Sequence, residues 1–131
     1  MTKNLQLLKI TFVIFGVVAL VYGVLFLLFP DVMVNASGSE PVPPGWLRWS
    51  GGILIALGIG SLSALKNPSK QETFVLALAL ATLLCGLALL YALLFESATE
   101  AWFTIIPVVI NLVVSILFWI GWNQLKTVQE E

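Results

Sequence analysis

Four long apolar stretches run along the chain and are separated by short polar segments. They cover about residues 7–29, 46–65, 73–95 and 102–122. A helix needs about 20 apolar residues to cross a bilayer, and each stretch meets that length. The stretches are continuous rather than alternating, and only helices or closed barrels satisfy their backbone polar groups in lipid. The pattern predicts an all-α fold, an integral membrane four-helix transmembrane bundle, as a single domain over residues 1–131.

The segments between these stretches contain residues that end helices. Pro30-Asp31 follows the first stretch, Pro44 precedes the second, and Asn67-Pro68 separates the second from the third. Residues 97–100 join the last pair. A cleaved signal peptide is the alternative for the first stretch, with a cleavage site near residues 34–36. However, the apolar region is longer than the usual 7–15 residues of a signal peptide.

The basic residues near the helix ends predict the orientation. Basic side chains gather in the segments that four spans would place on one side, and acidic ones gather on the other. The first group is Lys3, Lys9, Lys66, Lys70 and Lys126; the second is Asp31, Glu40, Glu96 and Glu100, with Arg48 as the one basic residue on that side. The tryptophans fall at the predicted interfaces, which agrees with this assignment. We therefore expect an inner-membrane protein with both termini in the cytoplasm.

The composition narrows the function classes. With 60% hydrophobic residues and a net charge of −1, the chain has no basic face to bind nucleic acid. It has no His, and its single Cys85 is expected to be a small buried helix residue. No acidic residue, Lys or His falls in the middle of a span, which disfavours a proton-coupled transporter. We predict no catalytic residue, no metal site and no cofactor.

A small-residue pattern on the second predicted helix indicates close helix packing. Gly52, Ala56, Gly60 and Ala64 recur every four residues. Small residues at this spacing let another helix backbone approach, which gains packing contacts that lipid does not supply. Packing within the chain is the first interpretation, and a homo-oligomer interface is the alternative.

The polar residues of the spans form a candidate ligand site in the outer half of the bilayer. We expect Arg48, Tyr22, Tyr91, Asn111 and Ser115 to surround it. Arg48 lies near the outer end of its helix, where it would hold an anionic lipid head or a ligand carbonyl; an interfacial anchor is the alternative. Asn111 lies close to the midplane, with Ser115 one turn later. Both could instead form hydrogen bonds between helices.

The second helix carries a family resemblance. The sequence WLRWSGGILIALGIG, which covers residues 46–60, resembles the second helix of small bacterial membrane proteins of the DoxX-like group. Arg48, Gly51 and Gly52 are the residues that match. The resemblance implies four spans over nearly the whole chain. Some members of that group resemble subunits of quinone-linked oxidoreductases.

These observations predict a small bacterial inner-membrane protein whose partner is membrane lipid. The first interpretation is binding of a lipid-like or apolar ligand, or a role as a non-catalytic subunit of a membrane complex. The alternative is an accessory subunit of a quinone-linked membrane oxidoreductase, with Arg48, Tyr91 and Asn111 around the quinone head. A uniporter or channel is a third class, disfavoured because no continuous polar stripe joins the two sides.

Overall fold

The computed structural model describes residues 5–41, 43–96 and 99–129. Lys3, one of the basic residues that predict the orientation, and residues 97 and 98 of the predicted last connection lie outside these residues. The described chain is helical apart from its short connections, and it contains α1 (Gln6–Leu28), α2 (Pro30–Ser37), α3 (Gly45–Ala64), α4 (Glu72–Tyr91) and α5 (Ala101–Gln129). A 3₁₀ turn, η1 (Pro68–Lys70), precedes α4, and a π-helical turn, η2 (Ala92–Glu96), extends it.

The predicted four-helix membrane bundle is confirmed. Four helices are long and apolar enough to cross a membrane: Gln6–Leu28, Gly45–Ala64, Glu72–Glu96 and Ala101–Thr127. Their bounds agree with the predicted stretches to within one residue, except at the end of the last helix. There α5 continues beyond Trp122 to Gln129, because its polar last turns keep helical hydrogen bonds outside the apolar region.

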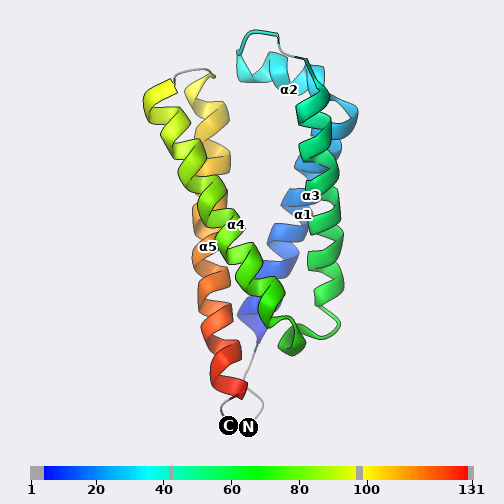
Figure 1. Ribbon diagram of the computed structural model, residues 1–131, viewed down its shortest axis with the longest axis vertical. Coiled ribbons are helices and arrows are strands. Elements are labelled where there is room, and N and C mark those ends of the chain that lie inside the picture. Colours follow the sequence, from blue (N-terminus) through cyan, green and yellow to red (C-terminus); the bar gives the residue numbers. More distant parts are fainter. Residues whose placement is uncertain (1–4, 42, 97–98, 130–131) are drawn as a thin grey trace.

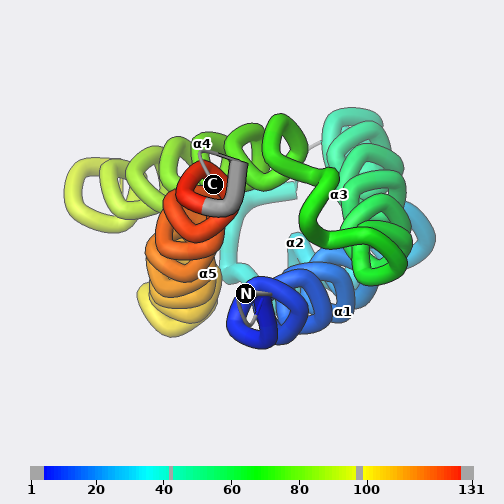
Figure 2. Tube along the Cα trace, turned by 90° about the horizontal axis from the view of Figure 1, so that it is seen from below, coloured from blue at the N-terminus to red at the C-terminus, as the bar shows by residue number. Residues whose placement is uncertain are grey.

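The long helices form two pairs, α1 with α3 and α4 with α5 (Figure 1). Each pair is packed along most of its length. The pairs meet at the end where α1 begins and α5 ends, and they separate toward the opposite end (Figures 1 and 2). We call the end where they meet the inner end and the opposite end the outer end. This divergence is the feature that positions the candidate site.

Glycines bring α1 and α3 into backbone contact. A Cβ on Gly51 would lie 2.7 Å from the carbonyl oxygen of Gly23, and one on Gly58 would lie 3.0 Å from that of Gly16. The two glycines on each helix are seven residues apart, so the antiparallel helices match glycine to glycine at two levels. The buried Ser61 hydroxyl adds a hydrogen bond to the Phe12 carbonyl at 2.9 Å. The close backbone approach and the hydrogen bond both join this pair.

The α4 and α5 pair also combines a glycine contact with a serine hydrogen bond, but with fewer glycines. A Cβ on Gly86 would lie 2.8 Å from Cδ2 of Leu112, so the glycine makes room for that side chain. The buried Ser115 hydroxyl donates to the Ala79 carbonyl at 3.0 Å. Each pair is thus fastened by one serine that donates to a carbonyl of the neighbouring helix.

Among the described residues, the large side chains that are fully buried between the pairs gather at the inner end. Phe12 is fully buried there, with its ring stacked on Phe74 at 6.3 Å and edge-on to Phe118 at 5.7 Å between centroids. The same cluster contains Leu8, Ala64, Val75, Leu78, Ala79, Val114 and Leu125. All four long helices contribute to it, so this cluster holds the two pairs together.

The short helix α2 lies across the outer end of the bundle (Figure 1) and was not expected from the sequence. Pro30 does end the first helix, as predicted, but it also starts α2 from the first helical position, where its missing amide hydrogen costs nothing. Gly38 ends α2 with φ of 69°, a left-handed conformation that favours glycine. The Glu100 amide donates to the Ser37 carbonyl at 2.7 Å, which fastens α2 to the start of α5.

The predicted packing stripe on the second spanning helix, α3, packs within the chain at only two of its four positions. A Cβ on Gly52 meets nothing within 4 Å, and Ala56 is exposed. Gly60 and Ala64 do face neighbours, because a Cβ on Gly60 would lie 3.3 Å from Phe74 and Ala64 belongs to the inner cluster. The contact with α1 runs instead through Gly51 and Gly58. Gly51 directly precedes Gly52, and one step along a helix turns the side-chain direction by about 100° around the helix axis.

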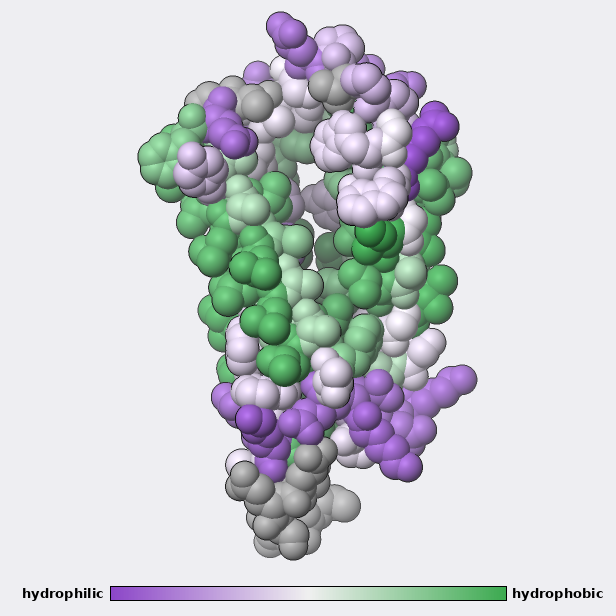
Figure 3. Space-filling view, viewed as in Figure 1, coloured by the Kyte–Doolittle hydropathy of each residue, from purple (hydrophilic) through white to green (hydrophobic). Residues whose placement is uncertain are grey.

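Hydrophobic and hydrophilic residues divide along the long axis of the molecule. Figure 3 shows apolar residues over the middle of one face and hydrophilic ones toward both ends. Four apolar helices of spanning length produce this belt, which makes the protein a multi-pass membrane protein.

Candidate functional site

A cavity of about 570 Å³ occupies the space between the two helix pairs in the outer half of the bundle. All four long helices and α2 contribute to its lining. The inner cluster closes it below, and the buried face of α2, with Met33 and Val34, covers it at the outer end. The face seen in Figure 3 is hollowed between the pairs. The cavity is therefore a cleft with a packed floor and a helical cover.

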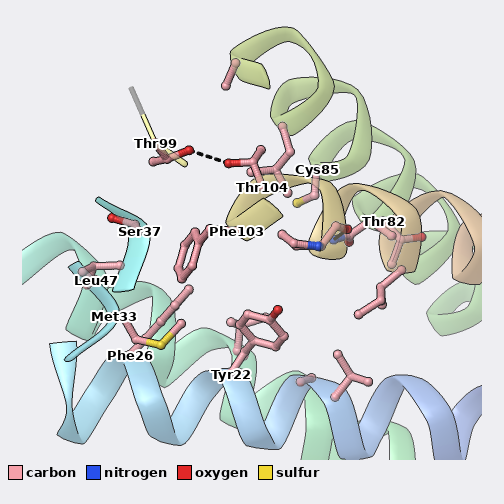
Figure 4. A pocket seen from close by; sticks show the side chains of 18 of the residues that line it. Tyr22, Phe26, Met33, Ser37, Leu47, Thr82, Cys85, Thr99, Phe103 and Thr104 are labelled. Carbon is pink, nitrogen blue, oxygen red and sulfur yellow. Dashed lines mark hydrogen bonds between the residues drawn. The ribbon is translucent and has the colours of Figure 1, made fainter. Parts of the chain in front are cut away.

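The lining is mostly apolar, with large side chains from every wall. Phe15, Val18 and Phe26 come from α1, Leu47 and Leu54 from α3, Leu89 from α4, and Phe103, Ile110 and Val114 from α5. Figure 4 shows Phe26, Met33 and Phe103 near one another toward the outer end. Such a lining excludes water and favours hydrocarbon.

A few polar groups line the middle of the cleft from facing helices. Tyr22 projects from α1, while Thr82 and Cys85 project from α4 into the same space (Figure 4). Thr82 donates to the Leu78 carbonyl at 2.7 Å, so its hydrogen is used within its own helix. The Tyr22 ring packs edge-on to Phe26, and no described residue forms a hydrogen bond with its hydroxyl. The Tyr22 hydroxyl thus remains available to a bound molecule.

Asn111 lines the cleft beside a proline. Pro107 lies inside α5 and lacks an amide hydrogen, so the helical hydrogen bond to the residue four before it is missing. The Asn111 amide nitrogen donates to the Pro107 carbonyl at 2.8 Å. Among the described residues, none donates to the Asn111 amide oxygen. Among the described residues, Asn111 therefore forms its side-chain hydrogen bond within its own helix and not between helices. Its amide oxygen is left as an acceptor in the cleft.

The outer end of the cleft is more polar. The Thr99 and Thr104 hydroxyls form a hydrogen bond with each other (Figure 4), and Ser37 donates to the Val34 carbonyl at 2.7 Å. Glu96, at the end of the π-helical turn, is the one charged side chain among the described lining residues. The cleft thus runs from hydroxyls and a carboxylate at the outer end to hydrocarbon at its floor.

The structure brings together two of the five residues predicted to bind a ligand. Tyr22 and Asn111 line the cleft, whereas Arg48, Tyr91 and Ser115 do not. Arg48 is exposed beside the 5% exposed Leu47, which lines the cleft in its place. Tyr91 is 59% exposed and packs on Phe95, and Ser115 faces α4.

The physical reason is the same for all three. Each is next to a lining residue, and one step along a helix turns the side chain about 100° away. Depth follows from position in the sequence, but rotation about the helix axis does not. The expectation for Cys85 is wrong for a related reason, because it is exposed and lines the cleft instead of being buried.

Several lining residues were missed by the sequence analysis. Thr82 and Thr104 are common hydroxyls in apolar helices, and nothing in their spacing sets them apart. Glu96 was placed at the outer side, and its role in the lining follows only from the π-helical turn, which extends α4 over the cleft. Among the described residues no cluster of three or more His, Cys, Asp or Glu could hold a metal ion.

The fold and the cleft define a class, a multi-pass helical membrane protein with an apolar cavity between two helix pairs. The chain belongs to the family described as Domain of unknown function (DUF4345), whose family model matches residues 7–122. That match includes all four spans. No curated protein and no solved structure matches the chain.

Proposed function

We propose that this protein binds a lipid-like molecule with an apolar tail in the cleft between its helix pairs. The observation that carries the proposal is the cavity of about 570 Å³ with an apolar floor and a polar outer end. Sites for small molecules measure roughly 300–1,000 Å³ and combine apolar walls with a few placed polar groups. Water in so apolar a cleft would find few hydrogen bonds, so an amphiphile is a better occupant.

The direction of the polarity supports an amphiphile that enters from one leaflet. A tail in the floor of the cleft would contact Phe15, Ile110 and Val114, and the head would lie at the level of Ser37, Thr99 and Thr104. Tyr22 and Asn111 would form hydrogen bonds with polar atoms of the ligand that lie between its tail and its head.

We further propose that the inner end is cytoplasmic in a bacterial inner membrane. Lys9 lies near the start of the first span and Lys126 in the last turn of the fourth, while Lys66 and Lys70 lie in the connection between α3 and α4 at that end. Cytoplasmic segments carry an excess of Lys and Arg, which supports this orientation. The cleft would then face the outer leaflet. A role as a subunit of a membrane complex or a homo-oligomer, and the DoxX-like relationship, stay predictions.

The single cysteine provides a direct test, because Cys85 lines the cleft in the unmodified protein. The purified chain is placed in phosphatidylcholine nanodiscs, and alkylation of Cys85 by a membrane-permeant maleimide is timed with and without 1-monolaurin. Occupancy of the cleft should slow alkylation severalfold in a saturable manner. Alkylation at an unchanged rate over the whole range of monolaurin would overturn the proposal.

A matched variant separates occupancy from a general effect of added lipid. Leu84 is 63% exposed on the same helix and does not line the cleft. A cysteine at that position, Leu84→Cys in a Cys85→Ala background, should react at the same rate with and without monolaurin. Decylubiquinone is tested in parallel, because the alternative of a quinone-linked accessory subunit predicts protection by that compound alone.

A further inference from the structure

The charges around the cleft select the head group of its ligand. We infer that the site prefers a cationic amphiphile to an anionic one, through Glu96; this rests on the proposed function, since it assumes that an amphiphile occupies the cleft. Glu96 is the one charged side chain among the described lining residues, and its carboxylate offers only acceptors. Arg48, the basic residue predicted to hold an anionic head, lies outside the lining.

The uncharged polar groups of the lining are compatible with a cationic head. Thr82 and Ser37 spend their hydrogens on backbone carbonyls, and one hydroxyl hydrogen is spent between Thr99 and Thr104. The Asn111 oxygen accepts from no described residue. The Tyr22 hydroxyl can donate or accept and the Trp46 indole can only donate, so these groups accommodate a donating head, and the preference itself rests on Glu96.

An anionic head would find little to hold it. A charge moved into an apolar cleft is costly unless it is paired or hydrogen-bonded, and the described lining supplies no cation. A primary ammonium group at the outer end would instead pair with Glu96 and donate to the hydroxyls beside it. Because Glu96 is exposed, water and salt weaken this pairing, and we expect a discrimination of about fivefold rather than several hundredfold.

The test compares competitors that share a twelve-carbon tail and differ in the charge of the head group. A monoacylglycerol with a diazirine in its chain is cross-linked to the full chain in nanodiscs, and cross-linking is competed with dodecylamine, 1-monolaurin or dodecanoate. Dodecylamine should halve cross-linking at about fivefold lower mole fraction than monolaurin, and dodecanoate should need more than monolaurin. High ionic strength should shrink both differences, as it does for exposed ion pairs.

Two glutamates provide the variants. Glu96→Gln keeps the side-chain shape without the charge and should bring the three competitors to within about twofold of one another. Glu40→Gln removes a charge from an exposed acidic residue at the same end that does not line the cleft, and should leave the order unchanged.

The outcomes separate this inference from the proposed function. Competition that is equal for the three heads, or unaffected by Glu96→Gln, would overturn the inference while the cleft remained a binding site. Failure of the diazirine probe to cross-link the cleft saturably would overturn the proposed function itself.

Discussion

The contacts within each helix pair differ in kind from the contacts between the pairs. Within a pair, backbones approach closely at glycines, and a serine reaches the carbonyl of its neighbour, Ser61 in one pair and Ser115 in the other. Between the pairs, large side chains such as Phe12 and Phe118 fill the inner end and leave the outer end hollow. Because these contacts within a pair do not involve the cleft, we expect each pair to stay intact whether or not something fills it. The following predictions test that division of roles.

The largest effect is expected between the pairs at the inner end. Phe12→Ala removes a fully buried ring that contacts two other aromatic rings, and the free energy of unfolding should fall by about 3–5 kcal/mol. Thermal unfolding in one detergent at a fixed scan rate measures it. Phe95→Ala, at a 71% exposed ring, is the control and should stay within about 0.5 kcal/mol of the wild type. An equal loss of unfolding free energy in the two variants would show that the inner cluster does not hold the two pairs together.

The next effect tests the contact within the first pair. Gly51→Leu forces a side chain against the Gly23 carbonyl and should cost about 3 kcal/mol, the upper end for overpacking. Gly52→Leu, one residue away, points into open space and should not lower the melting temperature. The reverse order would mean that α3 is rotated. If Gly52→Leu keeps its melting temperature but lowers the oligomer mass, the predicted homo-oligomer interface lies on that face.

A smaller effect is expected from the serines. Ser115→Ala deletes the hydrogen bond to Ala79, and bonds of this kind in membranes average about 0.6 kcal/mol. Ser63→Ala, at an exposed serine near the end of α3, is a matched control that should change nothing measurable. A loss at Ser115 well above 2 kcal/mol would show that the pair depends on this bond more than on its close packing.

The fold was largely predictable, because the number and length of the spans follow from the thickness of hydrocarbon. The short helix α2 was not, since eight residues with four buried positions do not stand out from a loop. Pro30 predicted the end of the first helix but not the start of a second one.

The candidate site was predictable in depth but not in rotation. Spanning helices are apolar nearly all round, so periodicity does not say which face meets a neighbour. Gly52 and Gly51 are adjacent, and the four-residue spacing selected the wrong one. The better signal was a match between two helices, since Gly16 and Gly23 have the same seven-residue spacing as Gly51 and Gly58. Asn111 was found because it is the amide near the midplane of its predicted span, and Tyr22 because it is a phenol in the outer half of the bilayer.

The most direct test of the central claim fills the cleft without disturbing the pairs. Ala92 lines the cleft, and Ala88, one turn before it, is exposed and does not. Native mass spectrometry of the protein released from its membranes should show one bound amphiphile per chain in the wild type and in Ala88→Phe. In Ala92→Phe the amphiphile should be lost while the melting temperature is kept. A bound amphiphile in Ala92→Phe at the wild-type level, or none in the wild type, would contradict the account.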